Sequence, residues 1–291
     1  MELRKNILQY VMDLYSKQEN EINISKFKTF ETLHPNGKVY AIDGGSSIIL
    51  DCGSMIISKI KISRTCYENG KRVPENEETK EFFVVAHNTE KGIKEKIFPE
   101  IKLKIEKCKL DEVHNEVRKS LERIEIEKLS ENISENDVIL ADGFFEKIES
   151  KSNIVFVCKT SRIFSKGGRS LIGYLNEFAE KNFKNKKWMY PISENEYVVK
   201  FHEKSNFCYK VNVKKPENID YLFGSIAFYS SDPEIIGYPY PLLKVDKIAR
   251  IRHDEKKIEN RKIKHGEFGK ILRNDENAAI MHEMLDKRMY R

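Results

Sequence analysis

Two aspartates each end a short apolar stretch and are each followed directly by glycine. Asp43 closes the stretch 39–42, and Asp142 closes the stretch 138–141. Side chains alternate across a strand, so each aspartate would share a face with the apolar residues two and four positions before it. An apolar strand that delivers a carboxylate beside a glycine can hold a ligand close to its backbone. Either motif alone could be an ordinary Asp-Gly turn, but two of them after apolar strands favour a site.

A third carboxylate could come from a helix predicted over residues 110–129. Its apolar positions step by three and four residues: Leu110, Val113, Val117, Leu121 and Ile124. At about 100° per residue, Glu125 lies roughly 80° from the centre of this stripe and can border the core. Glu122 lies about 140° away and is expected to face water. Glu127 borders the opposite side of the stripe and is a second candidate for the helix carboxylate. For each of them, a solvated surface glutamate is the alternative.

The string Gly237-Tyr238-Pro239-Tyr240-Pro241 is the most unusual in the chain. Its two prolines restrict the backbone and its two tyrosines add aromatic rings just before a helix that is expected to start at Pro241. Asp246 would lie about 60° from the centre of that helix's apolar face. An inward-facing acid is costly unless it is paired or bound to a metal ion. The alternative is a tyrosine–proline packing corner with Asp246 in a local salt bridge.

Basic residues gather around a glycine-containing loop that follows the predicted strand 154–158. They are Lys159, Arg162, Lys166 and Arg169. Such residues could contact the phosphates of a nucleic-acid backbone without reading its sequence. A solvated surface loop is the alternative.

The elements that would position these residues follow from apolar periodicity and turn residues. Strands are expected at 39–42, 48–50, 55–62, 81–87, 138–141, 154–158, 197–201, 207–213 and 222–229. Helices are expected at 2–18, 110–129, 170–183, from Pro241 onward, and near 275–288. This order predicts an α/β fold with some antiparallel pairing. We expect one domain over residues 1–291, with helical N- and C-terminal arms.

Composition narrows the class of protein. The 291 residues are 40% hydrophobic, which is enough for a core and too much for a disordered chain. No apolar run approaches the roughly 20 residues of a membrane span, and the charged N-terminus does not read as a secretory signal. The five cysteines are an odd number with no CxxC pair, so neither a zinc ribbon nor a disulfide framework is indicated. We therefore expect a cytoplasmic protein without a membrane partner. Its net charge of +6 is compatible with binding to a polyanion but does not require it.

Taken in order, these motifs resemble the NurA nucleases of archaea and some bacteria. The resemblance rests on Asp43 with its two glycines, Glu125, Asp142 with its glycine, and the Gly-Tyr-Pro-Tyr-Pro string. It covers nearly the whole chain and implies that Asp43, Glu125, Asp142 and Tyr238 are site residues. Asp246 stands eight residues after Tyr238, where the family usually has a histidine, and a carboxylate can also ligate manganese.

The resemblance implies an RNase H-like fold, with a central mixed β-sheet flanked by helices, and a manganese-dependent site that could also take magnesium. It implies degradation of single- and double-stranded DNA, by 5′-to-3′ exonuclease and single-strand endonuclease activities. It further implies a homodimer that works with a HerA-type hexameric ATPase in DNA end resection for recombinational repair.

The mechanism expected from this set is phosphodiester hydrolysis with two cations held by oxygen ligands. In this hypothesis Asp43 bridges both ions, while Asp142, Glu125 and Asp246 complete the ligand set. Tyr238 would orient a water molecule or a phosphate oxygen. Two alternatives stay open: a catalytically weakened NurA-like clamp that only binds DNA, and another RNase H-like phosphodiesterase.

Overall fold

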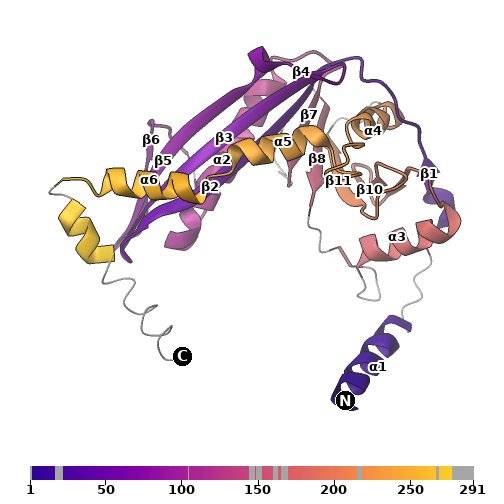
Figure 1. Cartoon of the computed structure of the whole chain (residues 1–291), viewed down its shortest axis with the longest axis horizontal. Helices are drawn as coiled ribbons and strands as arrows, with labels where there is room; N and C mark the ends of the chain where they lie inside the picture. Colours follow the sequence, from indigo (N-terminus) through magenta and orange to yellow (C-terminus); the bar gives the residue numbers. More distant parts are fainter. Residues whose placement is uncertain are drawn as a thin grey trace. The chain divides into compact units, whose positions relative to one another are not determined.

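The chain folds into two compact units in the computed structural model (Figure 1). The structure describes residues 2–16, 22–103, 105–143, 148, 153–159, 163–164, 170–214, 218–266 and 269–276. Unit 1 comprises Met1–Tyr40, Tyr67–Arg72 and Ser130–Leu243, and unit 2 comprises Ala41–Cys66, Val73–Leu129 and Lys244–Arg291. Each unit thus draws on three separate segments of the chain. The single nuclease domain expected over residues 1–291 stays a prediction.

Unit 1 is built on a mixed sheet. Its strands are β1 (Lys28–Thr29), β7 (Val138–Asp142), β8 (Asn153–Cys158), β9 (Trp188–Pro191), β10 (Glu196–Lys200) and β11 (Tyr209–Lys214). Hydrogen bonding orders them β1-β9-β10-β11-β8-β7, followed by the first residues of β2. β7 and β8 run parallel, whereas the pairs from β1 to β8 are antiparallel. The predicted strands 138–141 and 154–158 are therefore confirmed as the parallel pair.

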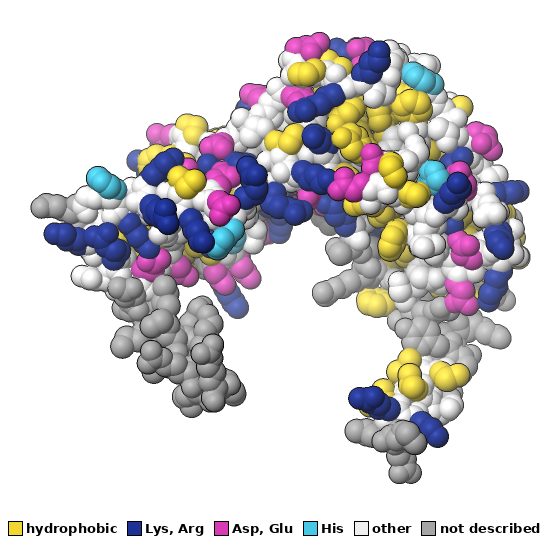
Figure 2. Space-filling view, viewed as in Figure 1, with side chains coloured by type: hydrophobic (Ala, Val, Ile, Leu, Met, Phe, Trp, Pro, Cys, Tyr) yellow, Lys and Arg dark blue, Asp and Glu magenta, His cyan; other side chains and the backbone are white. Residues whose placement is uncertain are grey.

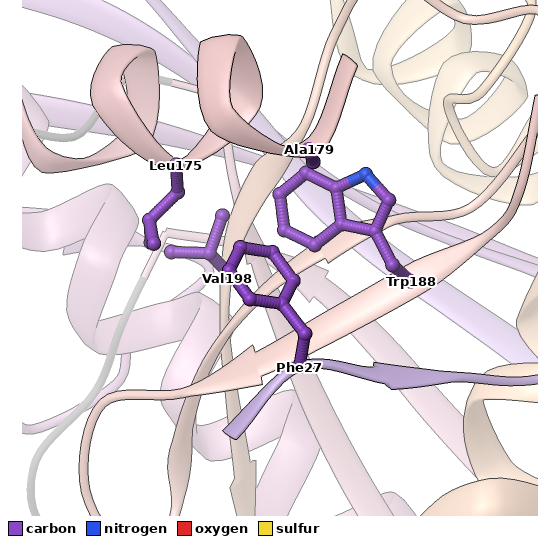
Figure 3. Close-up of a cluster of buried hydrophobic side chains, with 5 residues drawn as sticks. All are labelled: Phe27, Leu175, Ala179, Trp188 and Val198. Carbon is purple, nitrogen blue, oxygen red and sulfur yellow. The ribbon is translucent and has the colours of Figure 1, made fainter. Parts of the chain in front are cut away.

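An apolar cluster fixes helix α3 (Leu171–Asn182) to this sheet. Leu175 and Ala179 of the helix meet Trp188, Val198 and Phe27 (Figure 3). The ring of Phe27 lies 5.2 Å from that of Trp188, in an edge-on arrangement that aromatic pairs favour. The helix predicted at 170–183 is confirmed, and Ser170 caps its start by accepting a hydrogen bond from the amide of Gly173.

One predicted strand of unit 1 is wrong. Residues 219–228 form helix α4 (Ile219–Phe228), not a strand over 222–229. A continuous apolar run cannot be assigned to a buried helix or a buried strand by periodicity alone. Asn218 caps the start of the helix by accepting a hydrogen bond from the amide of Tyr221. Leu222 and Phe223, which belong to this helix, are buried.

Unit 2 contains an antiparallel sheet in the order β2-β3-β5-β6. Its strands are β2 (Val39–Asp51), β3 (Met55–Glu68), β5 (Glu78–Thr89) and β6 (Gly92–Phe98); the short β4 (Lys71–Arg72) pairs with the end of β3 in unit 1. The expected end of a strand at Ile42 is wrong, because β2 continues through Gly44 and Gly45 to Asp51. The strands predicted at 48–50 and 55–62 are confirmed as parts of β2 and β3, and the carboxylate of Asp51 accepts a hydrogen bond from the amide of Gly53 in the turn between them.

Helices cover both faces of the unit 2 sheet. Helix α2 (Val113–Ser130) meets the face carrying Arg64 of β3, because Glu125 pairs with that arginine. Helix α6 (His253–Ile263) meets the opposite face, because Glu255 pairs with Lys61, an odd-numbered residue of the same strand. Figure 1 shows α6 running across these strands. The α/β class, with a large mixed sheet flanked by helices, is confirmed.

The remaining elements are short or lie near the ends of the chain. They are α1 (Glu2–Ser16), α5 (Tyr240–Ala249), the 3-10 turns η1 (Ile24–Lys26), η2 (Pro74–Asn76) and η3 (Leu110–Glu112), and a helical stretch at 269–276. Most of the helix expected near 275–288 lies outside the described residues. None of the helices in the described ranges is both long enough and apolar enough to span a bilayer.

Candidate functional site

Three of the predicted site residues meet in unit 1. The Nζ atom of Lys159 lies 3.0 Å from Oδ2 of Asp142 and 5.6 Å from the centre of the Tyr238 ring. The ammonium group thus joins the carboxylate and the aromatic ring by an ion pair and a cation–π contact. Asp142 and Lys159 are both partly exposed, so a ligand can reach them.

The parallel pair β7–β8 explains why Asp142 and Lys159 lie together. Asp142 is the last residue of β7 and pairs in register with Val157 of β8, two residues before Lys159. The carboxyl ends of neighbouring parallel strands share one edge, which is where open α/β sheets bind ligands. Gly143 leaves this edge with a φ of +85°, a left-handed conformation that glycine adopts without strain. Burial raises the pKa of the neighbouring Cys158 thiol, which therefore stays protonated and is a poor metal ligand.

The Gly-Tyr-Pro-Tyr-Pro string forms a close-packed corner of unit 1. Gly237 has a φ of +94°, and a side chain there would lie 2.3 Å from Oγ of Ser205. Tyr238 is 4% exposed, and its ring lies 5.4 Å from that of Tyr209. Burial raises the pKa of Tyr209 to about 12, so this neighbour is a neutral phenol. Helix α5 begins at Tyr240, one residue before the predicted start.

In unit 2, the Asp43-Gly44 step lies against Glu122 of α2. The amide of Gly44 donates to the Asp43 carboxylate at 2.8 Å. A side chain on Gly44 would come within 2.3 Å of the Glu122 carboxylate, so only glycine lets the helix approach this closely. Arg118 ties the two elements together, because it donates to the carbonyl oxygen of Gly44 at 3.2 Å and to the Glu122 carboxylate.

The expectation that Glu122 faces water is wrong, because its side chain is buried with 5% exposure. A helical wheel counts only apolar residues as inward-facing, and here an arginine one turn earlier neutralises the buried acid. The buried face of α2 accordingly extends from Val117 and Leu121 across Glu122 to Ile126. The Arg-to-Glu spacing of four residues was the signal in the sequence that could have found this carboxylate.

Glu125 is also buried, but it is engaged elsewhere. Its Oε1 atom lies 2.9 Å from Arg64, and its Oε2 atom lies 2.6 Å from Lys80. Burial opposes the charge on Lys80, but the hydrogen bonds and negative charges of Glu125 and Glu78 together outweigh it and raise the pKa of the lysine. Glu125 lines a cavity of about 210 Å³ whose wall includes Phe82 and Pro99. With both oxygens held by cationic side chains, Glu125 fits a structural role better than that of a metal ligand.

Asp246 forms the local salt bridge that the sequence left open. Its Oδ2 atom lies 2.8 Å from Nη2 of Arg250, one turn further along, and its side chain is 25% exposed. Asp43 shares a strand face with Gly45, where a side chain would lie 2.1 Å from the carbonyl oxygen of Ala249. By strand alternation, Asp43 therefore points to the sheet face that the end of α5 covers.

Of the four predicted DNA-binding residues, Arg162, Lys166 and Arg169 lie outside the described residues. Lys159 is described, and its ammonium group is the ion-pair partner of Asp142.

The fit of these carboxylates to a metal ion can be judged from their partners. Within the described ranges, no group of three or more His, Cys, Asp or Glu side chains is arranged to hold a metal. Glu122, Asp142 and Asp246 instead each carry a basic side chain: Arg118, Lys159 and Arg250, respectively. A cation thus already stands at each of these acids, and carboxylate oxygens are the donors that manganese and magnesium prefer. The donor chemistry fits such an ion at the partly exposed Asp142 and Asp246, and does not fit it at Glu122 and Glu125, whose buried carboxylates are engaged by basic side chains.

Comparison with known proteins places the fold. No protein-family model and no curated protein matches the chain. Among solved structures, the NurA nuclease from Sulfolobus solfataricus superposes with a TM-score of 0.58 at 15% identity, covering 93% of this chain and 95% of that one. A second NurA structure gives 0.55 at 10% identity over 87% and 94%, and NurA bound to dAMP and manganese gives 0.53 at 9% identity over 87% and 93%. The chain thus has the fold of the NurA nuclease structures.

Proposed function

We propose that the protein is a metal-dependent nuclease that hydrolyses phosphodiester bonds in DNA. The observation that carries the proposal is the meeting of Asp142, Lys159 and Tyr238 at the carboxyl end of β7. The shared fold with NurA nucleases over nearly the whole chain supports it. One of those structures is described as bound to dAMP and manganese, which supports manganese as the ion.

In unit 1 the proposed ligand is Asp142, and in unit 2 the proposed ligands are Asp43 and Asp246. The two glutamates of α2 are left out, because Glu122 meets the face of β2 opposite to the Asp43 side chain and both oxygens of Glu125 are taken by Arg64 and Lys80. When bound, the ions supply positive charge to the phosphate group as negative charge develops on it.

In this proposal, other side chains neutralise charge, hold carboxylates in position and exclude water. Lys159 neutralises Asp142 before an ion binds, and it can then turn to a phosphate oxygen. Arg118 holds the Glu122 carboxylate in place through its second contact, the carbonyl oxygen of Gly44. Tyr238 forms an aromatic wall beside Lys159 and excludes water on that side.

The finer assignment is 5′-to-3′ exonuclease activity on single- and double-stranded DNA, together with single-strand endonuclease activity. In this proposal the protein acts as a homodimer with a HerA-type ATPase in DNA end resection. These statements rest on the family resemblance of the sequence motifs, and the fold supports them.

The test is digestion of end-labelled linear DNA in the presence of manganese. Asp43→Ala and Asp142→Asn should each lower the cleavage rate at least about 100-fold, because each removes a charged ligand. Asp220→Asn, a substitution at an exposed acid of α4, is the matched control and should cleave like the parent. If the parent protein leaves the DNA intact, the non-catalytic DNA-binding clamp becomes the favoured function. Full activity of Asp142→Asn would refute the proposed site.

A further inference from the structure

The cavity beside Glu125 lies in unit 2, between helix α2 and the strands β3 and β5, and has a volume of about 210 Å³. Its apolar lining consists of Ile62, Phe82, Pro99, Ile101, Leu121 and Ile124. Ile62, Phe82 and Leu121 are buried, whereas Pro99 is exposed, so the cavity is apolar inside and opens to solvent beside that proline. The opposite face of this sheet is covered by α6, over which Figure 2 shows Lys and Arg side chains. The apolar cavity is thus a feature of the α2 side.

A buried ion pair lies in this apolar lining. Glu125 is 6% exposed, and its two oxygens receive Arg64 at 2.9 Å and Lys80 at 2.6 Å. A carboxylate has about four acceptor positions, so each oxygen can accept one further hydrogen bond. The ammonium group of Lys80 has three N–H groups, and with Glu125 and Glu78 as partners it keeps one for a ligand. The cavity therefore offers an acceptor and a donor side by side.

We infer that this cavity binds a planar aromatic ring that carries one hydroxyl group. A hydroxyl group both donates and accepts, so it can donate to Glu125 and accept from Lys80 while the ring lies against the apolar lining. An apolar cavity of about 150 Å³ holds benzene, and this one also has room for a hydroxyl and a methyl group. The ligand is either a free phenolic compound or a tyrosine side chain of another protein, which have the same chemistry. The inference does not rest on the proposed nuclease function.

The charges around the cavity disfavour an anionic ligand. A second carboxylate would lie beside Glu125, whose negative charge would repel it. At the opening, Glu100 and Lys128 carry opposite charges and add no net attraction for an anion. A phenol avoids this repulsion, because its pKa of about 10 keeps it neutral near pH 7.

The apolar lining also disfavours a nucleobase. A nucleobase carries several donors and acceptors around its ring, and those that face Ile62, Phe82 and Leu121 would lose their water without gaining a partner. A phenol has a single polar group, which matches the single polar corner that Glu125 and Lys80 form.

The test is isothermal titration calorimetry of the full chain in EDTA, near pH 7, with p-cresol, toluene and p-toluate. These three compounds share a ring and a methyl group, and differ in carrying a hydroxyl, a hydrogen or a carboxylate opposite the methyl. p-Cresol should bind with a Kd of about 0.1–1 mM, which is ordinary for a ligand of its size. It should bind at least about 10-fold more tightly than toluene and p-toluate, because its hydroxyl meets two charged partners.

Two variants place the binding in this cavity. Ile124→Trp fills the cavity and should weaken p-cresol binding at least about 10-fold, whereas Ile258→Trp makes the same change at a 50% exposed position of α6 and should bind like the parent. Lys80→Met removes the donor and keeps Arg64 on Glu125. It should lower the affinity for p-cresol towards that for toluene and leave the affinity for toluene unchanged. Circular dichroism checks that each variant is folded.

Equal affinities for p-cresol and toluene would overturn the inference, because the hydroxyl group would then go unrecognised. Tighter binding of p-toluate, or p-cresol binding that is undiminished in a folded Ile124→Trp protein, would also overturn it. A blocked Gly-Tyr-Gly peptide that binds as tightly as p-cresol, and is lost with it in Ile124→Trp, would support a tyrosine side chain as the occupant. Binding of p-cresol without the peptide would support a free phenolic compound. DNA cleavage by the parent protein is not needed for any of these outcomes.

Discussion

The two buried glutamates of α2 have equal charge and different partners. Glu122 shares Arg118 with the backbone of Gly44, whereas Glu125 is held by Arg64 and Lys80 from two strands. A carboxylate with two cationic partners is neutralised within the fold, and removing it leaves those cations with the exposed Glu78 as their remaining counter-ion. The residue scale therefore separates an acid paired within its own helix from an acid that joins α2 to the sheet.

Glu122→Gln should leave the manganese-dependent cleavage rate within a few-fold of the parent, because the Glu122 carboxylate lies across β2 from the Asp43 side chain. Glu125→Gln should leave that rate within a few-fold of the parent, but should lower the free energy of unfolding by about 2–3 kcal/mol. DNA digestion and urea unfolding of both variants measure the two effects. The reverse pattern, with Glu125→Gln folded and inactive, would return the ligand role to Glu125.

At the scale of elements, strand β2 and the end of α5 touch at one glycine. A side chain on Gly45 would lie 2.1 Å from the carbonyl oxygen of Ala249, which is backbone and cannot rotate away. The same strand carries Asp43 two residues earlier, so this contact sets where α5 lies beside the candidate ligand.

Gly45→Ala should lower the free energy of unfolding by about 2–3 kcal/mol, since the added methyl group would push the backbone of β2 away from the backbone of Ala249. Gly173→Ala is the matched control: it lies in α3, its nearest atom would be 3.8 Å away, and alanine is the better helix former. Urea unfolding should show the control equal to the parent or more stable by about 0.5–1 kcal/mol. A Gly45→Ala protein as stable as the parent would show that α5 is not held at this point.

The ionic contact between α6 and the sheet makes this helix sensitive to pH. Burial raises the pKa of Glu255, but hydrogen bonds from Lys61 and Lys59 outweigh it, and the net pKa lies below the ordinary 4.5. For Lys59, burial lowers the pKa, but hydrogen bonds to Glu255 and Glu81 outweigh it, and the net pKa lies above the ordinary 10.5.

A lowered carboxylate pKa stabilises the folded state above its unfolded value, and that contribution is lost as the pH falls through the folded value. A raised lysine pKa acts in the opposite direction and is lost as the pH rises through the folded value above 10.5. Hydrogen exchange of α6 should therefore be slowest near neutral pH, after correction for the intrinsic rate, and should accelerate below pH 4.5. Helix α2 is the internal control, because Val117, Leu121 and Ile126 bury apolar surface. Equal loss of protection in both helices at low pH would point to global unfolding and would contradict the local effect.

At the scale of the whole molecule, metal binding is coupled to folding. A ligand that binds only the folded chain stabilises it by mass action, by about 2.7 kcal/mol at a concentration 100-fold above its Kd.

Manganese should raise the Tm of the parent protein in a concentration-dependent manner, and Asp142→Asn should abolish most of that rise. Sodium chloride at matched ionic strength corrects for screening, and Asp220→Asn should respond like the parent. Differential scanning fluorimetry measures the shift. An undiminished manganese effect in both Asp43→Ala and Asp142→Asn would place the ion at other residues.

Local patterns determined much of the fold. The apolar stretches before Asp43 and Asp142, and the helices at 110–129 and 170–183, are readable because burial imposes a period on neighbouring residues. The α/β class followed from the order of those stretches along the chain, whereas the resemblance to NurA nucleases rested on the motifs around Asp43, Glu125, Asp142 and Tyr238. The structure has the α/β class and shares the fold of the NurA structures. The run 222–229 is the exception, because a stretch that is apolar on every side has no period to read.

Tertiary structure alone decided which charged residues are buried and with whom. From the sequence, Glu122 is expected to face water and Glu125 to border the core, yet both side chains are buried. Their burial is possible because basic side chains pair with both carboxylates. For Glu125 those bases lie on β3 and β5, 61 and 45 residues earlier in the chain. The buried Lys59 under α6 is likewise explained only by acids from β5 and α6. Apolar burial leaves its mark on neighbouring residues, whereas charge pairing joins residues that only the folded chain brings together.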